Sequence, residues 1–441
     1  MAQNERTTSM FVLHRLRFLL IGLVTSVLIV GLFTTVGWTG TAADDPPPAT
    51  PEQVGMSSER LKRLDSAIHA YVDRGRTPGV VTLIARHGKI VHVDAYGPAD
   101  LASGRKIRDD DIFRMYSMTK PITSVALLML YEEGKFQLTD PLGRYMPAFN
   151  KVKVFTGFSA TGDMLLDSPK RPITVQDVFR HTAGFTYGLF GDTPVDKEYQ
   201  KAKLLDGDLK GFIEKLPTLP LLYQPGERWV YSISHDVQAA LVEQLSGMTF
   251  DEYVRRKIFA PLGMKDAIFK ITADRKARVP ALYSAGANGK IEPAENGVLT
   301  SNYGDAAFGG HSISSTGRDY ARFAQMLLNG GELNGARLLS PKTVELMTVN
   351  HLPERALSSP GSIGLNGGSG YGLGVSVLAN TARNGNIGSA GEFGWSGAAS
   401  THFLVDPKED LVAIYLTQLM GGDSGLRSEF VTLVYQSIIG K

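Results

Sequence analysis

One stretch predicts both a buried helix and a reactive group: Phe113-Arg114-Met115-Tyr116-Ser117-Met118-Thr119-Lys120-Pro121. The apolar run that follows, Val125 to Leu130, ends at Gly134 and is typical of a buried helix with a glycine stop. Ser117 then falls in the first helical turn, where backbone N–H groups are unpaired and the helix dipole favours negative charge. Pro121 suits this position because a missing N–H costs little so early in a helix.

Ser117 and Lys120 form the pattern S-x-x-K, which places an amine beside a hydroxyl. Residues three apart lie on one helix face, so the Lys120 ammonium can reach the Ser117 hydroxyl. A serine hydroxyl is a weak nucleophile until a neighbouring group takes its proton. A desolvated lysine, or a phenolate that it stabilises, can do this. A capping serine followed by a solvated lysine gives the same pattern, so the rest of the chain has to decide.

Composition places the chain among folded proteins. Of its 441 residues, 43% are hydrophobic and 20% are charged, which suits one large domain or two smaller ones. The formal net charge of +2 is too small to indicate a nucleic-acid partner. The chain has no cysteine, which excludes disulfides, a cysteine nucleophile and thiolate metal sites.

The N-terminal segment predicts export. Basic residues precede an uncharged run over 18–40, which has about the length needed to span a bilayer. Thr41-Ala42-Ala43 resembles a small-residue cleavage site, so residues 1–43 are either a cleaved signal peptide or an uncleaved membrane anchor. In both cases a Pro-rich linker over 44–55 follows, and the remainder is periplasmic or secreted, with attachment to the inner membrane through residues 18–40 in the second case.

Strand patterns lie near both chain ends, with helical patterns between them. A helix capped by Ser57 leads into strands over 80–85 and 89–95, while strands over 401–405 and 411–417 precede a last helix over about 428–439. This order predicts an α+β fold over residues 56–441: an antiparallel sheet formed by both chain ends, flanked by helices, with an inserted mainly helical subdomain. The helices expected between the ends cover 117–133, 175–180, 236–246, 250–259 and 318–328, and the glycine-rich stretch 361–374 is expected to be a mobile loop.

Two further motifs carry chemical groups. A Pro-Gly turn precedes Tyr231, where a phenol beside Lys120 would act as a general base, although a tyrosine packed at a helix start is the alternative for this segment alone. The second motif is Gly394-Trp395-Ser396-Gly397-Ala398. Its glycines, on an edge, would let a ligand lie close to the backbone, and a backbone N–H there could join that of Ser117 in holding an oxyanion. A glycine-rich turn is the alternative for this segment alone.

In this order, Ser117-x-x-Lys120, Tyr231-Ser232 and Trp395-Ser396-Gly397 resemble the serine β-lactamase and penicillin-binding-protein superfamily. The resemblance is closest to the branch that holds class C β-lactamases, family VIII carboxylesterases and D-amino-acid peptidases, and it extends from about residue 51 to 441. Residues 173–177, 181–184, 314–316 and 319–321 also match this branch. It implies a β-lactamase/transpeptidase-like fold and an acyl-enzyme mechanism that needs no cofactor and no metal.

The resemblance also implies a role for each matched residue. Ser117 would be the acylated nucleophile, Lys120 would assist its deprotonation, and Tyr231 would relay the proton. The backbone N–H groups of Ser117 and Ala398 would form the oxyanion hole. Which of Lys120 and Tyr231 is the acylation base stays open. The motif Trp395-Ser396-Gly397 would contact the substrate.

Two departures from the family pattern bear on the substrate. Ile233 stands where the family has asparagine, and Trp395 stands where it has the lysine that would pair with a carboxylate. An apolar wall at Trp395 suits an uncharged acyl or alcohol group, which favours ester substrates and argues against good β-lactam turnover, with amides and β-lactams as the further possible substrates. A β-lactamase or D-amino-acid carboxypeptidase acting on cell-wall-like peptides, a non-catalytic binder of such peptides and an acyltransferase of the same fold remain alternatives.

Other hydrolase classes fit the sequence less well. Gly394 to Ala398 is close to the nucleophile elbow G-x-S-x-G, but the only later histidine, His402, precedes Asp406, so the order of a triad fails. His235 is expected on the surface, with a role beside Tyr231 as the alternative; His181 and His311 are expected in turns. The histidines do not cluster at metal-ligand spacing, which argues against a zinc hydrolase.

Overall fold

A computed structural model describes residues 49–286, 290–294, 306–353, 356, 365, 367–422 and 424–440. The expected signal or anchor and the first part of the expected linker lie outside these residues. Within the linker range, Pro51–Val54 forms a short 3₁₀ helix, and the Val54 side chain is buried. In the part of the chain that is described, no helix combines the length and the apolar character that a membrane crossing requires.

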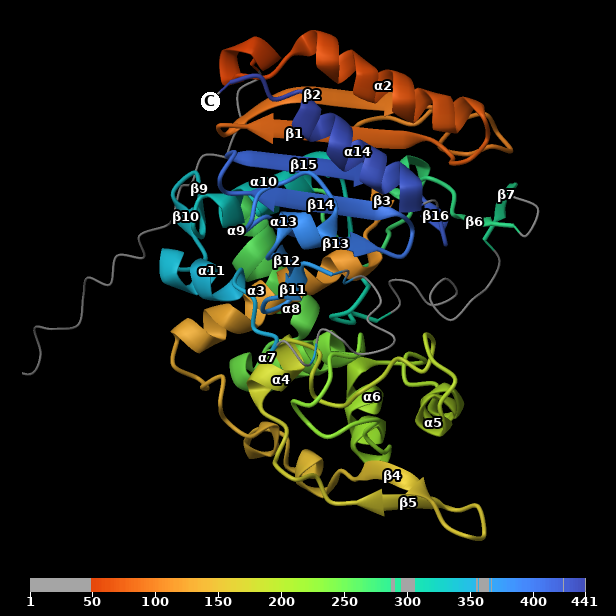
Figure 1. Cartoon of the computed structure of the whole chain (residues 1–441), viewed down its shortest axis with the longest axis vertical. Coiled ribbons are helices and arrows are strands. Elements are labelled where there is room, and N and C mark those ends of the chain that lie inside the picture. Colours follow the sequence, from red (N-terminus) through yellow and green to blue (C-terminus); the bar gives the residue numbers. More distant parts are fainter. Residues whose placement is uncertain are drawn as a thin grey trace, which may run out of the picture. The chain divides into compact units, whose positions relative to one another are not determined.

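A seven-stranded antiparallel sheet is the centre of the fold, in the order β11-β12-β13-β14-β15-β1-β2 (Figure 1). Strand β1, from the N-terminal part, pairs with β15, from the C-terminal part, with Val81 opposite Leu416. The predicted α+β fold, with a sheet completed by both chain ends, is therefore confirmed. The strands are β1 (Val80–Arg86), β2 (Lys89–Tyr96), β11 (Ser369–Tyr371), β12 (Ser376–Leu378), β13 (Phe393–Gly397), β14 (Thr401–Asp406) and β15 (Leu411–Leu416).

Strand β15 shows how the sheet is buried on both faces. Successive side chains of a strand point to opposite faces. Leu411, Ala413 and Tyr415 pack in the layer with α2 (Ser58–Asp73) and α14 (Ser424–Gln436), which lie together over one face of the sheet (Figure 1). The intervening residues of β15 join the larger core on the other face, where α10 (Gly317–Leu328) packs against β15, β1 and β14.

A mainly helical region is inserted between β2 and β11, as predicted. Its central helix, α3, packs against α7 and α8 and is buried over most of its length because nearly every side chain after Lys120 is apolar or small. The helices of this region, besides α10, are α3 (Thr119–Glu132), α4 (Val175–Phe179), α5 (Pro194–Ala202), α6 (Leu209–Lys215), α7 (Ser234–Ser246), α8 (Phe250–Val254), α9 (Ala260–Leu262) and α11 (Pro341–Met347). The short helix α13 (Thr381–Asn384) lies outside it, between β12 and β13.

Short sheets complete the described structure. Strand β3 (Phe113–Arg114), which leads into Ser117, pairs with β8 (Ser314–Ser315). The others are β4 (Val154–Phe158) with β5 (Met164–Asp167), β9 (Glu332–Leu333) with β10 (Ala336–Arg337), and β6 (Tyr283–Ala285) between β7 (Ile291–Pro293) and β16 (Leu419–Met420).

Three local expectations need correction. Ser117 lies in a 3₁₀ turn, Tyr116–Met118, and the α-helix begins only at Thr119. The stretch 361–374 is not wholly a loop, because Ser369–Tyr371 is the strand β11 at the edge of the main sheet; residues 361–364 and 366 lie outside the described part. The helix expected over 428–439 spans Ser424–Gln436.

Candidate active site

The segment before Ser117 has an unusual backbone. Tyr116 has a φ of 47°, in the left-handed region that a large L-residue seldom adopts. Such conformations persist only where surrounding contacts hold them, and they gather at functional sites. Here β3 anchors the chain before the turn, and α3 begins directly after it. The turn leaves Ser117 partly exposed although both of its neighbours are buried.

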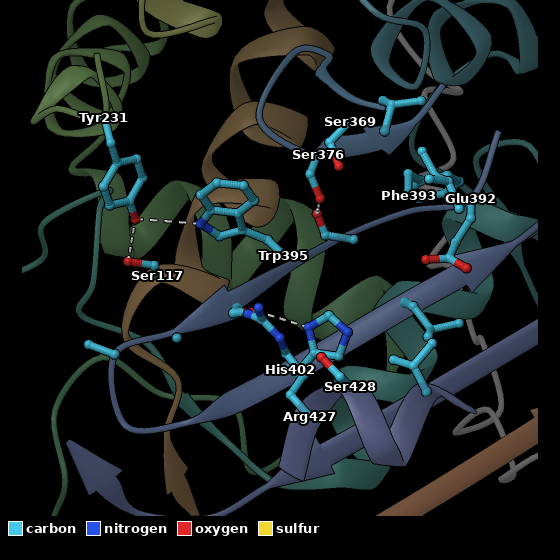
Figure 2. Close-up of a pocket in the computed structure, with 18 of the residues that line it drawn as sticks. Ser117, Tyr231, Ser369, Ser376, Glu392, Phe393, Trp395, His402, Arg427 and Ser428 are labelled. Atoms are coloured by element: carbon cyan, nitrogen blue, oxygen red, sulfur yellow. Dashed lines mark hydrogen bonds between the residues drawn. The ribbon is translucent and has the colours of Figure 1, made fainter. Parts of the chain in front are cut away.

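The structure brings the three predicted side chains together at Ser117. The Lys120 Nζ lies 3.0 Å from Ser117 Oγ, as expected for positions three apart at the start of a helix. The Tyr231 hydroxyl oxygen, from a segment more than a hundred residues later, lies 2.6 Å from the same Ser117 Oγ. Figure 2 shows the Tyr231 phenol directed at Ser117, with Trp395 beside it. An alcohol, an amine and a phenol therefore share one hydrogen-bonded centre.

The Lys120 ammonium is enclosed by protein. The residue has no exposed surface. Besides Ser117, its Nζ donates a 2.8 Å hydrogen bond to the carbonyl oxygen of Gly310. It also lies 4.8 Å from the ring centre of Tyr231 and 5.4 Å from that of Tyr187, a geometry typical of cation–π contacts. These contacts fix the amine next to the serine.

Tyr231 is held in an aromatic cluster. The Trp395 Nε1 lies 3.5 Å from its hydroxyl oxygen, a long contact at the limit of a hydrogen bond. The ring of Tyr231 contacts the rings of His181, Tyr187, Phe190, Trp229 and Trp395 at centroid distances between 5.1 and 6.1 Å. Tyr231 is buried, with 9% of its surface exposed, and its hydroxyl is directed at Ser117 (Figure 2). This packing leaves the phenol little freedom to turn away.

The glycine-rich motif is a strand, not the turn that was the alternative interpretation. Strand β13 pairs with β14 along its whole length, so it is not an edge strand. Its pairing with β12 covers only Phe393 and Gly394, so the half from Trp395 to Gly397 extends beyond β12. At Gly397 a Cβ atom would lie 2.3 Å from the carbonyl oxygen of Met115. Glycine therefore lets this strand approach the segment that carries Ser117.

A cavity of about 370 Å³ opens beside these groups. Ser117, Tyr231, Trp395, Ser396, Gly397 and Ala398 all line it, so the structure brings the predicted substrate-contacting residues to the predicted nucleophile. Figure 2 shows the cavity extending from Ser117 and Tyr231 toward Phe393 and Glu392. Much of its wall is apolar, including Leu189, Phe190, Leu378, Ile387, Leu404 and Val431.

Part of the cavity wall is polar, which the sequence reasoning missed. Arg427, on α14, donates a 2.9 Å hydrogen bond to Ser396 Oγ and lines the same cavity. The Nδ1 of His402 lies 2.9 Å from Ser396 Oγ as well. Helix α14 follows the last strands of the sheet, and no local motif marks one of its arginines as a cavity residue. A cation is therefore present although the lysine of the family pattern is replaced by Trp395.

Ser396 and His402 form a serine–histidine contact that does not have the properties of a catalytic pair. Burial and the charge of Arg427 lower the pKa of His402 to about 3, so its imidazole is a poor base near neutral pH. Asp406, the acid of the rejected triad, instead accepts from the Tyr435 hydroxyl at 2.7 Å. The structure thus agrees with the sequence argument against a nucleophile elbow.

The prediction that His235 lies on the surface is wrong. Its side chain is fully buried on α7, and burial lowers its pKa well below the ordinary value. His181 occupies a turn with a φ of 56°, as expected, and its Nδ1 lies 3.1 Å from Ser232 Oγ. Within the described residues, no three or more His, Cys, Asp or Glu side chains gather as a candidate metal site.

Asp236 and Gly310 are further residues of the centre that no sequence pattern indicated. Gly310 accepts the Lys120 hydrogen bond through its carbonyl, and its N–H donates to Asp236 Oδ1 at 2.8 Å. Asp236 is fully buried on α7, and burial raises its pKa to about 6. The three residues come from distant parts of the chain, so only the folded structure reveals the contact.

Comparison with known proteins identifies the family of the chain. The family model described as Beta-lactamase matches residues 64–436. Lovastatin esterase from Penicillium rubens is 31% identical over 371 residues, which cover 80% of this chain and 91% of the esterase.

Two solved structures share the fold. Simvastatin synthase (LovD) from Aspergillus terreus superposes with a TM-score of 0.76 at 24% identity, covering 86% of this chain and 98% of LovD. A family VIII carboxylesterase superposes with a TM-score of 0.66 at 20% identity, covering 87% of this chain and 99% of the carboxylesterase. The chain therefore belongs to the β-lactamase family, in the class C-like branch that also holds lovastatin esterase.

Proposed function

We propose that the chain is a serine hydrolase that cleaves carboxylic esters through an acyl-enzyme on Ser117. One observation carries the proposal: the Lys120 Nζ and the Tyr231 hydroxyl oxygen lie 3.0 and 2.6 Å from Ser117 Oγ. Both distances lie within hydrogen-bond reach, which a nucleophile and its base require. Occupied positions for nucleophile, amine and phenol argue against a purely binding role.

In the proposed reaction, Ser117 Oγ attacks the ester carbonyl carbon while its proton passes to the unprotonated member of the Lys120–Tyr231 pair, either a Tyr231 phenolate beside the Lys120 ammonium or a Lys120 amine beside the Tyr231 phenol. The N–H groups of Ser117 and Ala398 stabilise the negative charge that develops on the carbonyl oxygen. The C–O bond to the alcohol then breaks, and the leaving oxygen receives a proton from Tyr231. A water molecule then attacks the acyl carbon and gives a proton to the same pair. The bond between the acyl carbon and Ser117 Oγ breaks, Oγ receives that proton from the pair, and the acid leaves.

The wall of the cavity supports esters with an apolar acyl or alcohol group. Trp395, Phe190 and Tyr187 stand near Ser117, and further apolar side chains extend along the cavity. Burial of such a group is favourable in proportion to the apolar area removed from water. The identity with lovastatin esterase points in the same direction. If an alcohol replaces water as the acceptor of the acyl group, the same intermediate gives an acyltransferase reaction.

A second candidate substrate class rests on Arg427. Its guanidinium lies at Ser396, in the cavity that contains the proposed nucleophile. Guanidinium groups recognise carboxylates through paired hydrogen bonds. A β-lactam or a peptide with a free carboxylate is therefore the alternative substrate. Comparing nitrocefin and D-alanyl peptides with neutral esters, in the wild type and in Arg427→Ala, separates the two classes.

The direct kinetic test is Ser117→Ala with short-chain p-nitrophenyl esters. We expect turnover to fall to the background rate while thermal unfolding stays close to that of the wild type. Ser396→Ala is the matched control. It also removes a serine hydroxyl that lines the cavity, but that hydroxyl contacts His402 and not Lys120 or Tyr231. Wild-type turnover in Ser117→Ala, or loss of turnover only in Ser396→Ala, would overturn the proposed function. Export of the domain stays a prediction, which fractionation of cells expressing the full chain would test.

A further inference from the structure

The enclosed ammonium of Lys120 needs a compensating negative charge. A buried cation is costly unless it is paired and hydrogen-bonded. Its hydrogen-bond partners, Ser117 and Gly310, are neutral, and the ring faces of Tyr231 and Tyr187 compensate only in part. The charge of Lys120 favours the ionised form of Asp236, so the two groups are coupled electrostatically.

Gly310 links the carboxyl group to the ammonium. Asp236 Oδ1 accepts the Gly310 N–H at 2.8 Å, and the Gly310 carbonyl oxygen accepts Lys120 Nζ at 2.8 Å. A Cβ atom on Gly310 would lie 3.0 Å from each carboxyl oxygen of Asp236 and 3.0 Å from the Tyr187 hydroxyl. Glycine therefore suits this position, because without a side chain the Asp236 carboxyl group and the Tyr187 hydroxyl can both lie close to the Gly310 backbone.

The groups around Asp236 leave Lys120 as its main ionic partner. His235 precedes it on α7 and is neutral, because burial lowers its pKa well below the ordinary value. His311, next to Gly310, is neutral for the same reason, with a pKa lowered to about 3. Burial raises the pKa of Tyr187 well above its ordinary value, so that phenol is also uncharged.

We propose that Asp236 is a positioning residue of the catalytic centre: its carboxylate holds Gly310, places Lys120 against Ser117, and supplies the charge that the buried ammonium requires. The inference rests on the proposed function of Ser117. A hydrogen bond to a carboxylate is roughly twice as strong as one to a neutral acceptor. Protonation of Asp236 would therefore loosen Gly310 and lower the rate, with a step near the raised pKa of about 6.

The test is the pH profile of kcat and KM in Asp236→Asn, from about pH 5 to about pH 9, with a short-chain p-nitrophenyl ester. Asparagine keeps an oxygen that can accept the Gly310 N–H but removes the charge. We expect kcat to fall by about 10-fold to 10²-fold with KM changed little, and the step near pH 6 to disappear. Asp236→Ala, which also removes the acceptor, should lower kcat further.

Asp319→Asn is the matched control. Asp319 is also buried, its pKa is also raised to about 6, and its Oδ2 accepts the N–H of Asp266 at 2.6 Å. It lies on α10, and the contacts described for it do not involve Ser117, Lys120 or Gly310. Asp319→Asn should keep the wild-type pH profile of kcat, because it removes a buried carboxyl group with a similarly raised pKa away from Ser117.

Two outcomes would overturn the proposal: an Asp236→Asn enzyme with the wild-type kcat and pH step, or an equal change of profile in Asp319→Asn. If Asp236→Asn does not fold, the wild-type enzyme is used instead, and the rate at which a fluorophosphonate labels Ser117 is measured between about pH 5 and about pH 7. A labelling rate that does not change with pH over this range would also overturn the proposal. Persisting turnover in Ser117→Ala would instead overturn the proposed function, so the two failures are distinguishable.

Discussion

Gly397→Ala should slow catalysis by moving the nucleophile segment. The added Cβ would lie 2.3 Å from the Met115 carbonyl oxygen and 2.2 Å from Thr401 Oγ1, whereas real Cβ contacts are essentially never shorter than 3.0 Å. Strand β13 and the Met115 backbone must therefore separate by at least about 0.7 Å, which is the difference between the 3.0 Å limit and the 2.3 Å from the added Cβ to the Met115 carbonyl oxygen. Ser117 follows Met115 by two residues, and a misplacement of about 1 Å can cost 10²-fold in rate.

The assay is kcat and KM for a short-chain p-nitrophenyl ester, together with thermal unfolding. We expect kcat to fall by about 10-fold to 10²-fold, with a smaller effect on KM, because the added methyl moves reacting groups. Gly440→Ala is the control, since a Cβ there meets nothing within 4 Å. A folded Gly397→Ala enzyme with wild-type kcat would show that β13 can shift without moving Ser117, and would refute this reasoning.

Three further predictions follow from the same site. Lys120→Ala and Tyr231→Phe should each lower kcat/KM by about 10²-fold or more, because each removes a proton-transfer partner of the nucleophile. The measurement is steady-state kinetics, and a wild-type kcat/KM in either variant would contradict this role. Trp395→Lys should change the ratio of ester to nitrocefin turnover more than it changes thermal stability, and an unfolded or preference-neutral variant would count against the role of this wall. Burial and the charge of Asp406 raise the pKa of Glu392 from 4.5 to about 7, so the native state binds its proton more tightly than the unfolded state. The free energy of unfolding should therefore fall as the pH rises from about 4.5 to 7. Urea titrations across this range should show a smaller dependence of that free energy on pH in Glu392→Gln. An unchanged dependence in the variant would contradict the raised pKa of Glu392.

Strands β1, β2, β14 and β15 could be predicted because their signal is local, whereas β11, β12 and β13 were not predicted. Successive side chains of β15 point alternately to the two faces of the sheet, and all of them are apolar. This pattern indicates a strand that is buried on both faces. Strand β13 was harder because Gly394, Ser396 and Gly397 lower its strand propensity. Its pairing with β14 and the close approach of Gly397 to Met115 account for its form, and both depend on distant parts of the chain.

The active centre divides in the same way. Ser117 and Lys120 are visible from their spacing, and Tyr231 from its Pro-Gly turn and its family motif. Asp236 sits within a run of polar residues on α7 that resembles a surface face, yet the fold buries it against Gly310. His235 was misplaced for the same reason. Burial of a polar helix face becomes predictable only when its partners, here Gly309 and Gly310 with Lys120, are known.

Mass spectrometry of the full chain labelled with a fluorophosphonate tests the central claim most directly. Ser117 is the hydroxyl that both an amine and a phenol meet, while Ser396 meets an imidazole with a pKa of about 3. We predict a single adduct in the peptide that contains Ser117, and its loss in Ser117→Ala. An adduct on Ser396, or labelling that persists in Ser117→Ala, would contradict the account.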